Sequence, residues 1–284
     1  MFGDCPVHMV LDGVYYRAAI DHQKDAPDDW LIRSRLLDYQ KRGITYLRDG
    51  GDRWGVGLHA SRIAEEYGIT YRTPAFPICR RDHYGSFIGR GFDDLNGYRE
   101  LLCEVKAQGG HFIKIMISGL MDFNRYGVVT DTPCEPALIK DMISAAHDSG
   151  FAVMAHANGD KAVSAAIACG VDSIEHGAYL SAETIHQLAE SSTVWVPTAV
   201  TIANLIGLGR FPEEVLQPLL QLQLGNVALV ASLGACIAVG SDAGAYAVYH
   251  GQGCEDEVKV LGGVLGEDAD RILRRGEEEI RRRF

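Results

Sequence analysis

The chain has 284 residues, 47% of them hydrophobic, and a formal net charge of −11 from 27 basic and 38 acidic residues. This length and composition allow a large core, in one β/α barrel or two smaller domains, and exclude a disordered chain. The negative charge disfavours nucleic acid and anionic membranes as partners, and the N-terminus lacks the basic and apolar regions of a targeting segment. No stretch reaches the roughly 18 apolar residues of a membrane span, so we expect a cytoplasmic protein.

Eight short apolar runs, rich in β-branched residues and separated by amphipathic stretches, predict alternating strands and helices. The runs are 7–11, 44–47, 71–78, 112–117, 152–156, 173–176, 194–199 and 236–240. The segment 136–149 carries a helical apolar stripe, and Gly150 ends it. Eight such repeats with no Pro/Ser-rich linker favour a single (β/α)8 barrel over residues 1–284 rather than two separate sheets.

Polar residues stand at the ends of several of these apolar strands. They are His8 in the first, Lys114 inside the fourth, His156 ending the fifth, His176 ending the sixth and Asp242 following the eighth. At the C-terminal mouth of a barrel such positions converge on one cavity. A lone histidine on an apolar strand is usually a core residue, but two on consecutive strands, with an aspartate and a lysine, indicate a site.

Imidazole nitrogens and carboxylate oxygens suit zinc or a similar divalent ion. All five residues are therefore candidate metal ligands, and Asp242 is also the candidate catalytic residue that takes a proton from water and passes it to a leaving nitrogen. Bound metal lowers the pKa of water toward about 7, which predicts hydrolysis of an amide. Lys114 fits as a ligand if CO2 carboxylates its desolvated amine; the alternative is a surface lysine on an edge strand.

The combined motifs resemble the metal-dependent amidohydrolase superfamily, in particular its imidazolonepropionase-like and prolidase-like branch. The resemblance spans most of the chain and rests on the segments 44–51, 113–116, 155–159, 170–177, 196–198 and 238–244. It implies one or two divalent metal ions, with zinc expected. It also implies a carboxylated Lys114 that bridges two metals, with His156 and His176 on one metal and Asp242 on the other as proton shuttle.

One departure from this family lies in the first strand. The family carries a His-x-His pair there, and alternation along a strand points both side chains into the barrel. This chain has Pro6-Val7-His8 instead, and proline offers no ligand atom. Three alternatives follow: a one-metal enzyme, a weakened two-metal enzyme, or a barrel without turnover that binds a small molecule.

A second departure is length. Family members usually carry a small β-sandwich domain built from segments on both sides of the barrel, and this chain reaches its first motif at once. We expect the sandwich to be lacking. Exposed barrel surface would then be covered by charge or by another copy of the chain, so a homo-oligomer is one expected assembly.

Two long connections, 80–91 and 119–132, follow the third and fourth strands and are expected to form substrate loops at the C-terminal face. Basic side chains there could hold a substrate carboxylate, although a solvated loop has the same composition. The weaker substrate-binding candidates in this region and just after the eighth strand are Arg80, Arg81, His83 and His250.

The sequence thus predicts a metal-dependent hydrolase of a carbon–nitrogen bond in an amide, a cyclic amide or a dipeptide-like compound. A deaminase is less favoured, because that branch uses a glutamate shortly after the fifth-strand histidine. A lactone or phosphotriester hydrolase would use the same chemistry, and the barrel without turnover is the alternative from another functional class.

Overall fold

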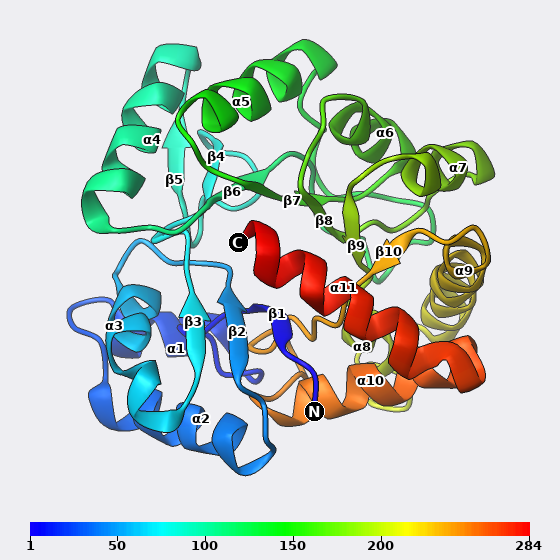
Figure 1. The fold of residues 1–284 in the computed structure, drawn as a ribbon, viewed down its shortest axis with the longest axis horizontal. Coiled ribbons are helices and arrows are strands. Elements are labelled where there is room, and N and C mark those ends of the chain that lie inside the picture. Colours follow the sequence, from blue (N-terminus) through cyan, green and yellow to red (C-terminus); the bar gives the residue numbers. More distant parts are fainter.

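The computed structural model of the protein describes residues 1–284. Strands form a ring with helices around its outside, an α/β architecture (Figure 1). The strands are β1 (Asp4–Val7), β2 (Tyr46–Asp49), β3 (Thr70–Arg72), β4 (Ile78–Arg80), β5 (Arg90–Phe92), β6 (Ile113–Met116), β7 (Val153–Ala157), β8 (Ser173–His176), β9 (Val194–Val196) and β10 (Cys236–Ile237). The helices are α1 (Tyr16–Gln23), α2 (Asp29–Lys41), α3 (Val56–Ile63), α4 (Leu95–Gln108), α5 (Pro136–Asp148), α6 (Asp160–Ala168), α7 (Ala182–Glu190), α8 (Val200–Ala203), α9 (Glu213–Ser232), α10 (Gln252–Leu265) and α11 (Ala269–Arg283).

The strands pair in parallel in two sheets, β1-β2-β3 and β10-β9-β8-β7-β6-β4-β5. The third predicted strand, 71–78, is divided: β3 pairs with β2, and its continuation β4 pairs with β6. Pro74 and Pro77 lie between the two halves and have no amide hydrogen for a ladder. The prediction of one uninterrupted strand here is therefore wrong, although both halves occupy the third place in the ring.

The first strand and the segment after β10 are joined by backbone hydrogen bonds outside the regular ladders. Asp242 N donates to Pro6 O at 2.9 Å, and His8 N donates to Ala243 O at 2.7 Å. These contacts bring the last strand region alongside the first, on the side of the ring away from β3. The predicted β/α barrel architecture is confirmed, with parallel strands in ring order and helices outside.

The strand boundaries follow hydrogen bonding rather than apolar character alone. The predicted run 173–176 coincides with β8, whereas the run 7–11 was placed too late, because β1 ends at Val7. Leu11 N donates to His8 O at 2.9 Å, so the chain already turns there while its side chains remain buried. Burial continues past the end of the strand, and an apolar run therefore does not mark where pairing stops.

By length and composition alone, α9 is long and apolar enough to cross a membrane. It contains Pro218 and the buried polar residues Gln223 and Asn226. The Nε2 atom of Gln223 donates to the carbonyl oxygen of His176 at 2.6 Å. In this structure α9 is a barrel helix that braces the C-terminal end of β8.

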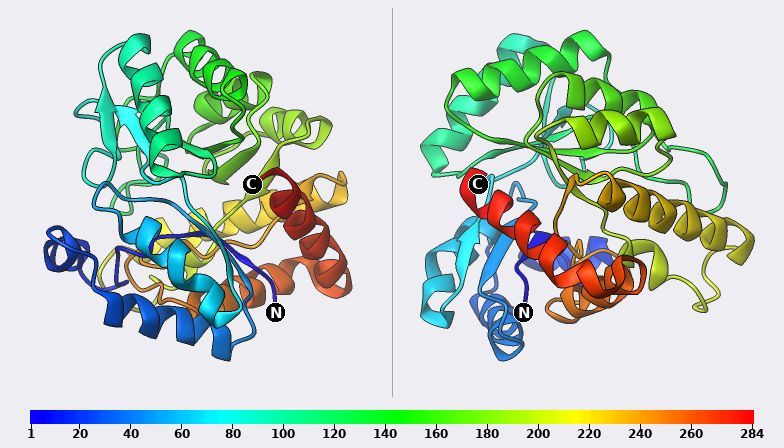
Figure 2. Two further views of the ribbon diagram at one scale, coloured as in Figure 1. Left: turned by 60° about the vertical axis from the view of Figure 1, so that its left-hand side comes forward. Right: turned by 45° about the vertical axis from the view of Figure 1, so that its right-hand side comes forward.

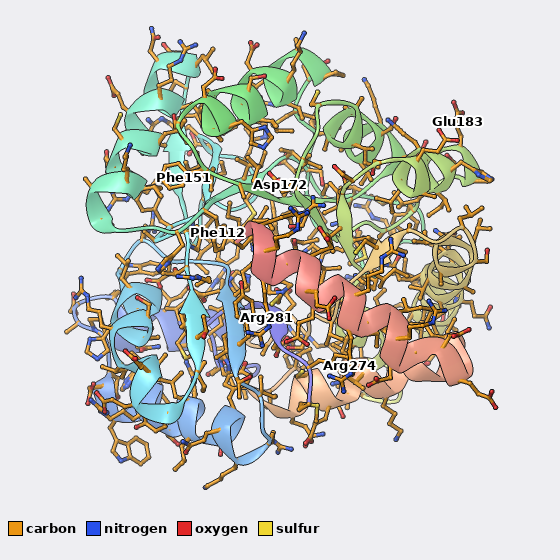
Figure 3. The ribbon with its side chains drawn as sticks, viewed as in Figure 1. Phe112, Phe151, Asp172, Glu183, Arg274 and Arg281 are labelled. Carbon is orange, nitrogen blue, oxygen red and sulfur yellow. The ribbon has the colours of Figure 1, made fainter.

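The C-terminal helix α11 lies across the N-terminal end of the strand ring (Figures 1 and 2). Phe284 packs edge-on against Phe112, which precedes β6, with ring centroids 5.2 Å apart. Figure 3 shows Phe112 beside the end of α11, with Arg281 and Arg274 along the helix. Ile280 and Phe284 form one buried cluster with residues at the strand starts, so α11 closes this end of the ring.

We expect a methyl group at Gly276 of α11 to destabilise the fold. A Cβ there would meet Ile237 O at 1.8 Å, and Gly276→Ala should lower the free energy of unfolding by about 2 kcal/mol because overpacking outweighs the gain in helix propensity. Gly263 in α10 has open space at its Cβ position. Gly263→Ala should therefore raise the free energy of unfolding by about 0.5–1 kcal/mol. Urea unfolding measures both, and equal effects would contradict the close packing of α11.

Candidate active site

Two histidines meet at the C-terminal ends of neighbouring strands. His156 lies in β7 and His176 ends β8, and both side chains are buried. Their ring centroids are 4.7 Å apart with an interplanar angle of 65°. Because β7 and β8 are adjacent and parallel, the strand pairing itself brings these two rings together, as the sequence predicts.

Each of these rings has one nitrogen held by the protein and one without a protein partner. His156 Nε2 donates to Gly119 O at 3.1 Å, and His176 Nδ1 is hydrogen-bonded to Thr198 Oγ1 at 2.7 Å. Burial lowers the pKa of His176 to about 4, and burial together with the neighbouring His176 lowers the pKa of His156 well below its usual value. Both imidazoles are therefore neutral at pH 7. His156 carries its lone pair on Nδ1, because its Nε2 donates, and His176 offers a lone pair on Nε2 in the tautomer whose Nδ1 donates to Thr198.

The second pair in the site is His8 and Asp242, with His8 Nε2 3.3 Å from Asp242 Oδ1. Neither Oδ1 of Asp242 nor Nδ1 of His8 has a hydrogen-bond partner. Burial opposes ionisation of Asp242, but His8, His176 and Lys114 outweigh it and hold the pKa of this carboxyl well below its usual value. Asp242 is thus an ionised carboxylate with an oxygen free to accept a proton or bind a cation.

The backbone is strained where the strands end at this site. His176, Thr198 and Asp242 have φ values of 71°, 46° and 59°, a region that residues other than glycine rarely occupy. Such conformations cost on the order of 1–3 kcal/mol each and cluster at functional sites. Their concentration around one cluster of polar side chains supports a functional role for it.

Lys114 is buried in β6, which lies between β4 and β7, so the alternative of a surface lysine on an edge strand is wrong. It forms no ion pair, and burial lowers the pKa of its amine, with Asp242 and Glu175 opposing the shift. Within the ring Arg48 Nη2 lies 2.8 Å from Glu175 Oε1, and both side chains are fully buried. Sequence reasoning missed this pair, although charged residues inside two apolar strands were a signal for it.

Space and support for His8 come from β2. A Cβ on Gly50 would lie 2.2 Å from Cε1 of His8, so only glycine leaves room for this ring. Asp49 accepts hydrogen bonds from Met9 N and Thr73 Oγ1, each at 3.1 Å. Burial raises the pKa of Asp49, with His8 opposing the shift. The sequence analysis did not select Asp49 as a site residue. It ends an apolar strand with a carboxylate, and the same kind of pattern identified Asp242 after the eighth strand.

The donor chemistry of the site fits a divalent metal in part. Two neutral imidazoles with free nitrogens are typical zinc ligands, and the hydrogen bond on the other nitrogen is the usual support for such a ligand. No three His, Cys, Asp or Glu side chains lie close enough together to hold an ion as they stand. Lys114 and Asp242 are the remaining sequence candidates for a third donor beside His156 and His176.

The sequence pattern that defines the Amidohydrolase family matches residues 38–252, which is most of the chain. The chain belongs to the amidohydrolase family. The matched part includes Lys114, both histidines of the pair and Asp242. The resemblance drawn from the sequence motifs is thereby confirmed.

Among curated sequences, an uncharacterized protein of Mycobacterium tuberculosis is 34% identical over 130 residues, which are 44% of this chain and 35% of that protein. The aligned residues thus make up about a third of the length of this relative. A solved Xaa-Pro dipeptidase with methionine in its active site has a TM-score of 0.76 at 20% identity and covers 99% of this chain and 75% of that one. An A. niger ochratoxinase has a TM-score of 0.75 at 18% identity, covering 98% and 68%. At such identities these structures show the shared fold.

The weaker loop candidates of this amidohydrolase lie in different places. Arg81 pairs with Asp93 at 2.7 Å and lines an acidic hollow beside α4, so it is not brought to the histidine pair. Arg80 and His83 line a small hollow together with Tyr84, and the ring centroid of Tyr84 lies 4.6 Å from that of His156. Arg80 and His83 thus share a hollow with a ring that contacts His156, but His156 and His176 do not line that hollow.

His250 is a packing residue in this member of the amidohydrolase family rather than a substrate ligand. Its Nε2 donates to Leu11 O at 2.9 Å, and its Nδ1 is hydrogen-bonded to Tyr39 Oη at 3.0 Å. Burial, and then the charge of Arg35, lower the pKa of His250 well below its usual value. Both ring nitrogens are occupied, so this ring fixes the loop after β1 to α2.

We expect acid to weaken the fold through His250. The pKa of His250 is lower in the native state than in the unfolded chain, where it is about 6.5. Below pH 6.5 the unfolded chain therefore binds a proton that the native state does not bind. The free energy of unfolding thus decreases as the pH is lowered. Between pH 7 and pH 5 this contribution amounts to about 2 kcal/mol. Urea unfolding at both pH values compares the wild type with His250→Phe, and the variant should lose less stability on acidification. An equal loss in both proteins would contradict a neutral His250.

Proposed function

We propose that this protein is a metal-dependent hydrolase of a carbon–nitrogen bond in an amide, a cyclic amide or a dipeptide-like compound. The observation that carries the proposal is the neutral pair His156 and His176, in which each ring has one nitrogen in a hydrogen bond and one without. Beside this pair lies the ionised Asp242, whose Oδ1 accepts no hydrogen bond. Free imidazole nitrogens and a carboxylate oxygen are a donor set for a divalent ion.

In this proposal His156 and His176 would hold one divalent ion, and Lys114 would be the third ligand once its neutral amine has added CO2 and released a proton to form a carbamate. When bound, the ion supplies a Lewis acid that polarises a carbonyl and lowers the pKa of water toward about 7. The single ion follows from the first strand: Pro6 offers no ligand atom, and His8 is left with Asp242 alone.

Asp242 moves the proton. Its Oδ1, which accepts no hydrogen bond, takes a proton from the water that attacks the amide carbon and returns this proton to the nitrogen as the carbon–nitrogen bond breaks. His8, at 3.3 Å from the same oxygen, keeps the carboxylate oriented between the two transfers. The low pKa of Asp242 keeps this carboxyl in its unprotonated form at neutral pH.

The substrate class is supported by the family match and by the shared fold with an Xaa-Pro dipeptidase. A barrel that binds a small molecule without turnover is the second candidate, favoured by Pro6 and by the lack of three preassembled ligands. Metal content separates the two, because it is measured without a substrate.

We expect the protein purified without chelator to contain about one equivalent of a divalent metal, as a two-histidine site with a third ligand requires. His176→Asn should lose this metal, whereas His147→Asn, which changes a histidine paired with Asp172 on the outside, should keep it. Elemental analysis measures the content, and urea unfolding checks that both variants fold. A metal content below about a tenth of an equivalent in the wild type, with none regained on adding zinc, would contradict the enzyme proposal.

Restoring a histidine in the first strand should build the second metal site. Pro6→His supplies the missing imidazole next to His8, and we expect the metal content to rise from about one toward about two equivalents. Pro6→Ala removes the proline without adding a ligand and should leave the content unchanged. Elemental analysis of the two variants measures the difference, and equal contents would mean that the site is rebuilt around the proline.

A further inference from the structure

A row of aromatic rings runs from the molecular surface to His156. Ring centroids are 5.6 Å apart between Tyr16 and Phe87, 6.0 Å between Phe87 and Tyr84, and 4.6 Å between Tyr84 and His156. Tyr15 extends the row outward, at 6.3 Å from Tyr16. We call Tyr15, Tyr16, Phe87 and Tyr84 the aromatic track.

Exposure falls steadily along the aromatic track toward the site. Tyr15 is 55% exposed, Tyr16 41% and Phe87 38%, while Tyr84 is partly buried and His156 is 2% exposed. The track therefore begins in solvent and ends on a histidine of the active site. Exposed apolar groups that are continuous with a functional site mark ligand-binding surfaces more often than isolated exposed residues do.

The outer half of the track is held by the loop after β1. Asp12 Oδ1 accepts hydrogen bonds from Val14 N at 2.8 Å and from Tyr15 N at 2.9 Å, which fixes the turn that leads into Tyr16. Gly13 N donates to Gly244 O at 3.1 Å, so this loop is tied to the segment that carries Asp242. The outer rings and the proton-transfer residue thus share one support.

The inner half of the track is held by the loop after β4. Tyr84 N donates to Asp131 Oδ2 at 2.7 Å, and His83 Nδ1 lies 3.0 Å from Asp131 Oδ1. A Cβ on Gly85 would meet the Met116 side chain at 2.6 Å, so this loop sits closely on β6. Ordered supports of this kind reduce the entropy lost when a ligand binds.

We propose that the aromatic track binds an aromatic ring of the amide substrate and places its carbon–nitrogen bond at His156, His176 and Asp242. The proposal rests on the proposed hydrolase function and names its substrate class. Small-molecule sites combine apolar, largely aromatic walls with a few polar groups at one end, and the track with its terminal histidine has this composition. The rings of Tyr16 and Phe87 meet at 74°, an edge-to-face arrangement that a further ring can extend.

Binding by the purified full-length protein tests the proposal with three probes. N-benzoyl-L-alanine carries a ring on the acyl side, N-acetyl-L-phenylalanine carries one on the amine side, and N-acetyl-L-alanine carries none. Calorimetry should give at least about tenfold tighter binding of one of the two aromatic probes than of N-acetyl-L-alanine. Equal affinities for all three probes would overturn the proposal.

Variants of Phe87 show whether the track is responsible. Phe87→Ala should reduce the aromatic preference at least about fivefold, and Phe87→Tyr should retain it, because the ring is the group that binds. Trp30→Ala removes an aromatic side chain that is 76% exposed on α2 and outside the track, and should leave the preference unchanged. A preference that survives Phe87→Ala, or that is lost in Trp30→Ala, would overturn the assignment to the track.

Turnover of the same probes separates this inference from the proposed function. If they are hydrolysed, Phe87→Ala should lower kcat/KM for the aromatic probe about fivefold, chiefly by raising KM, whereas Trp30→Ala should leave both constants unchanged. Aromatic preference without hydrolysis would support the track and contradict the proposed hydrolysis. Hydrolysis without aromatic preference would contradict the track alone.

Discussion

The contact between the first strand and the segment after β10 is the interaction on which the rest of this structure depends. Hydrogen bonds from Asp242 N to Pro6 O and from His8 N to Ala243 O join regions separated by nearly the whole chain. The same contact sets the His8 ring beside the Asp242 carboxylate. The pair His156 and His176 has a different origin, because it follows from two neighbouring strands and the helix between them. One half of the site is therefore local in sequence, and the other half exists only when the ring of strands is complete.

Burial of charge gives the site its chemical character. Removing histidine rings from water favours their neutral form, whereas Asp242 stays ionised because cationic or protonatable neighbours outweigh its own desolvation. Arg48 and Glu175 place a fully buried ion pair inside the same ring. Such a pair adds little net stability, but both of its charges act on Lys114. The interior of this barrel thus holds charged groups and is not uniformly apolar.

The sequence predicted the elements that depend on local pattern and missed those that depend on contacts across the ring. The run 173–176 coincides with β8 because its polar ends are also the ends of pairing. The run 7–11 was misplaced, because residues after Val7 are buried without being paired. Arg81 shares a loop with Arg80 but faces an acidic partner on the outside, and no local pattern distinguishes the two. The aromatic track joins loops that follow different strands, so its rings are neighbours only in the folded chain.

The position of α11 determines how molecules enter and leave. Phe284 and Ile280 fill the N-terminal end of the ring with a packed apolar cluster, and close packing leaves no passage for water through such a layer. The histidine pair lies at the opposite, C-terminal ends of β7 and β8, so its exchange with solvent takes place on the side of the loops. In the proposed hydrolase, the substrate and the products of its cleavage would therefore use the same face of the barrel.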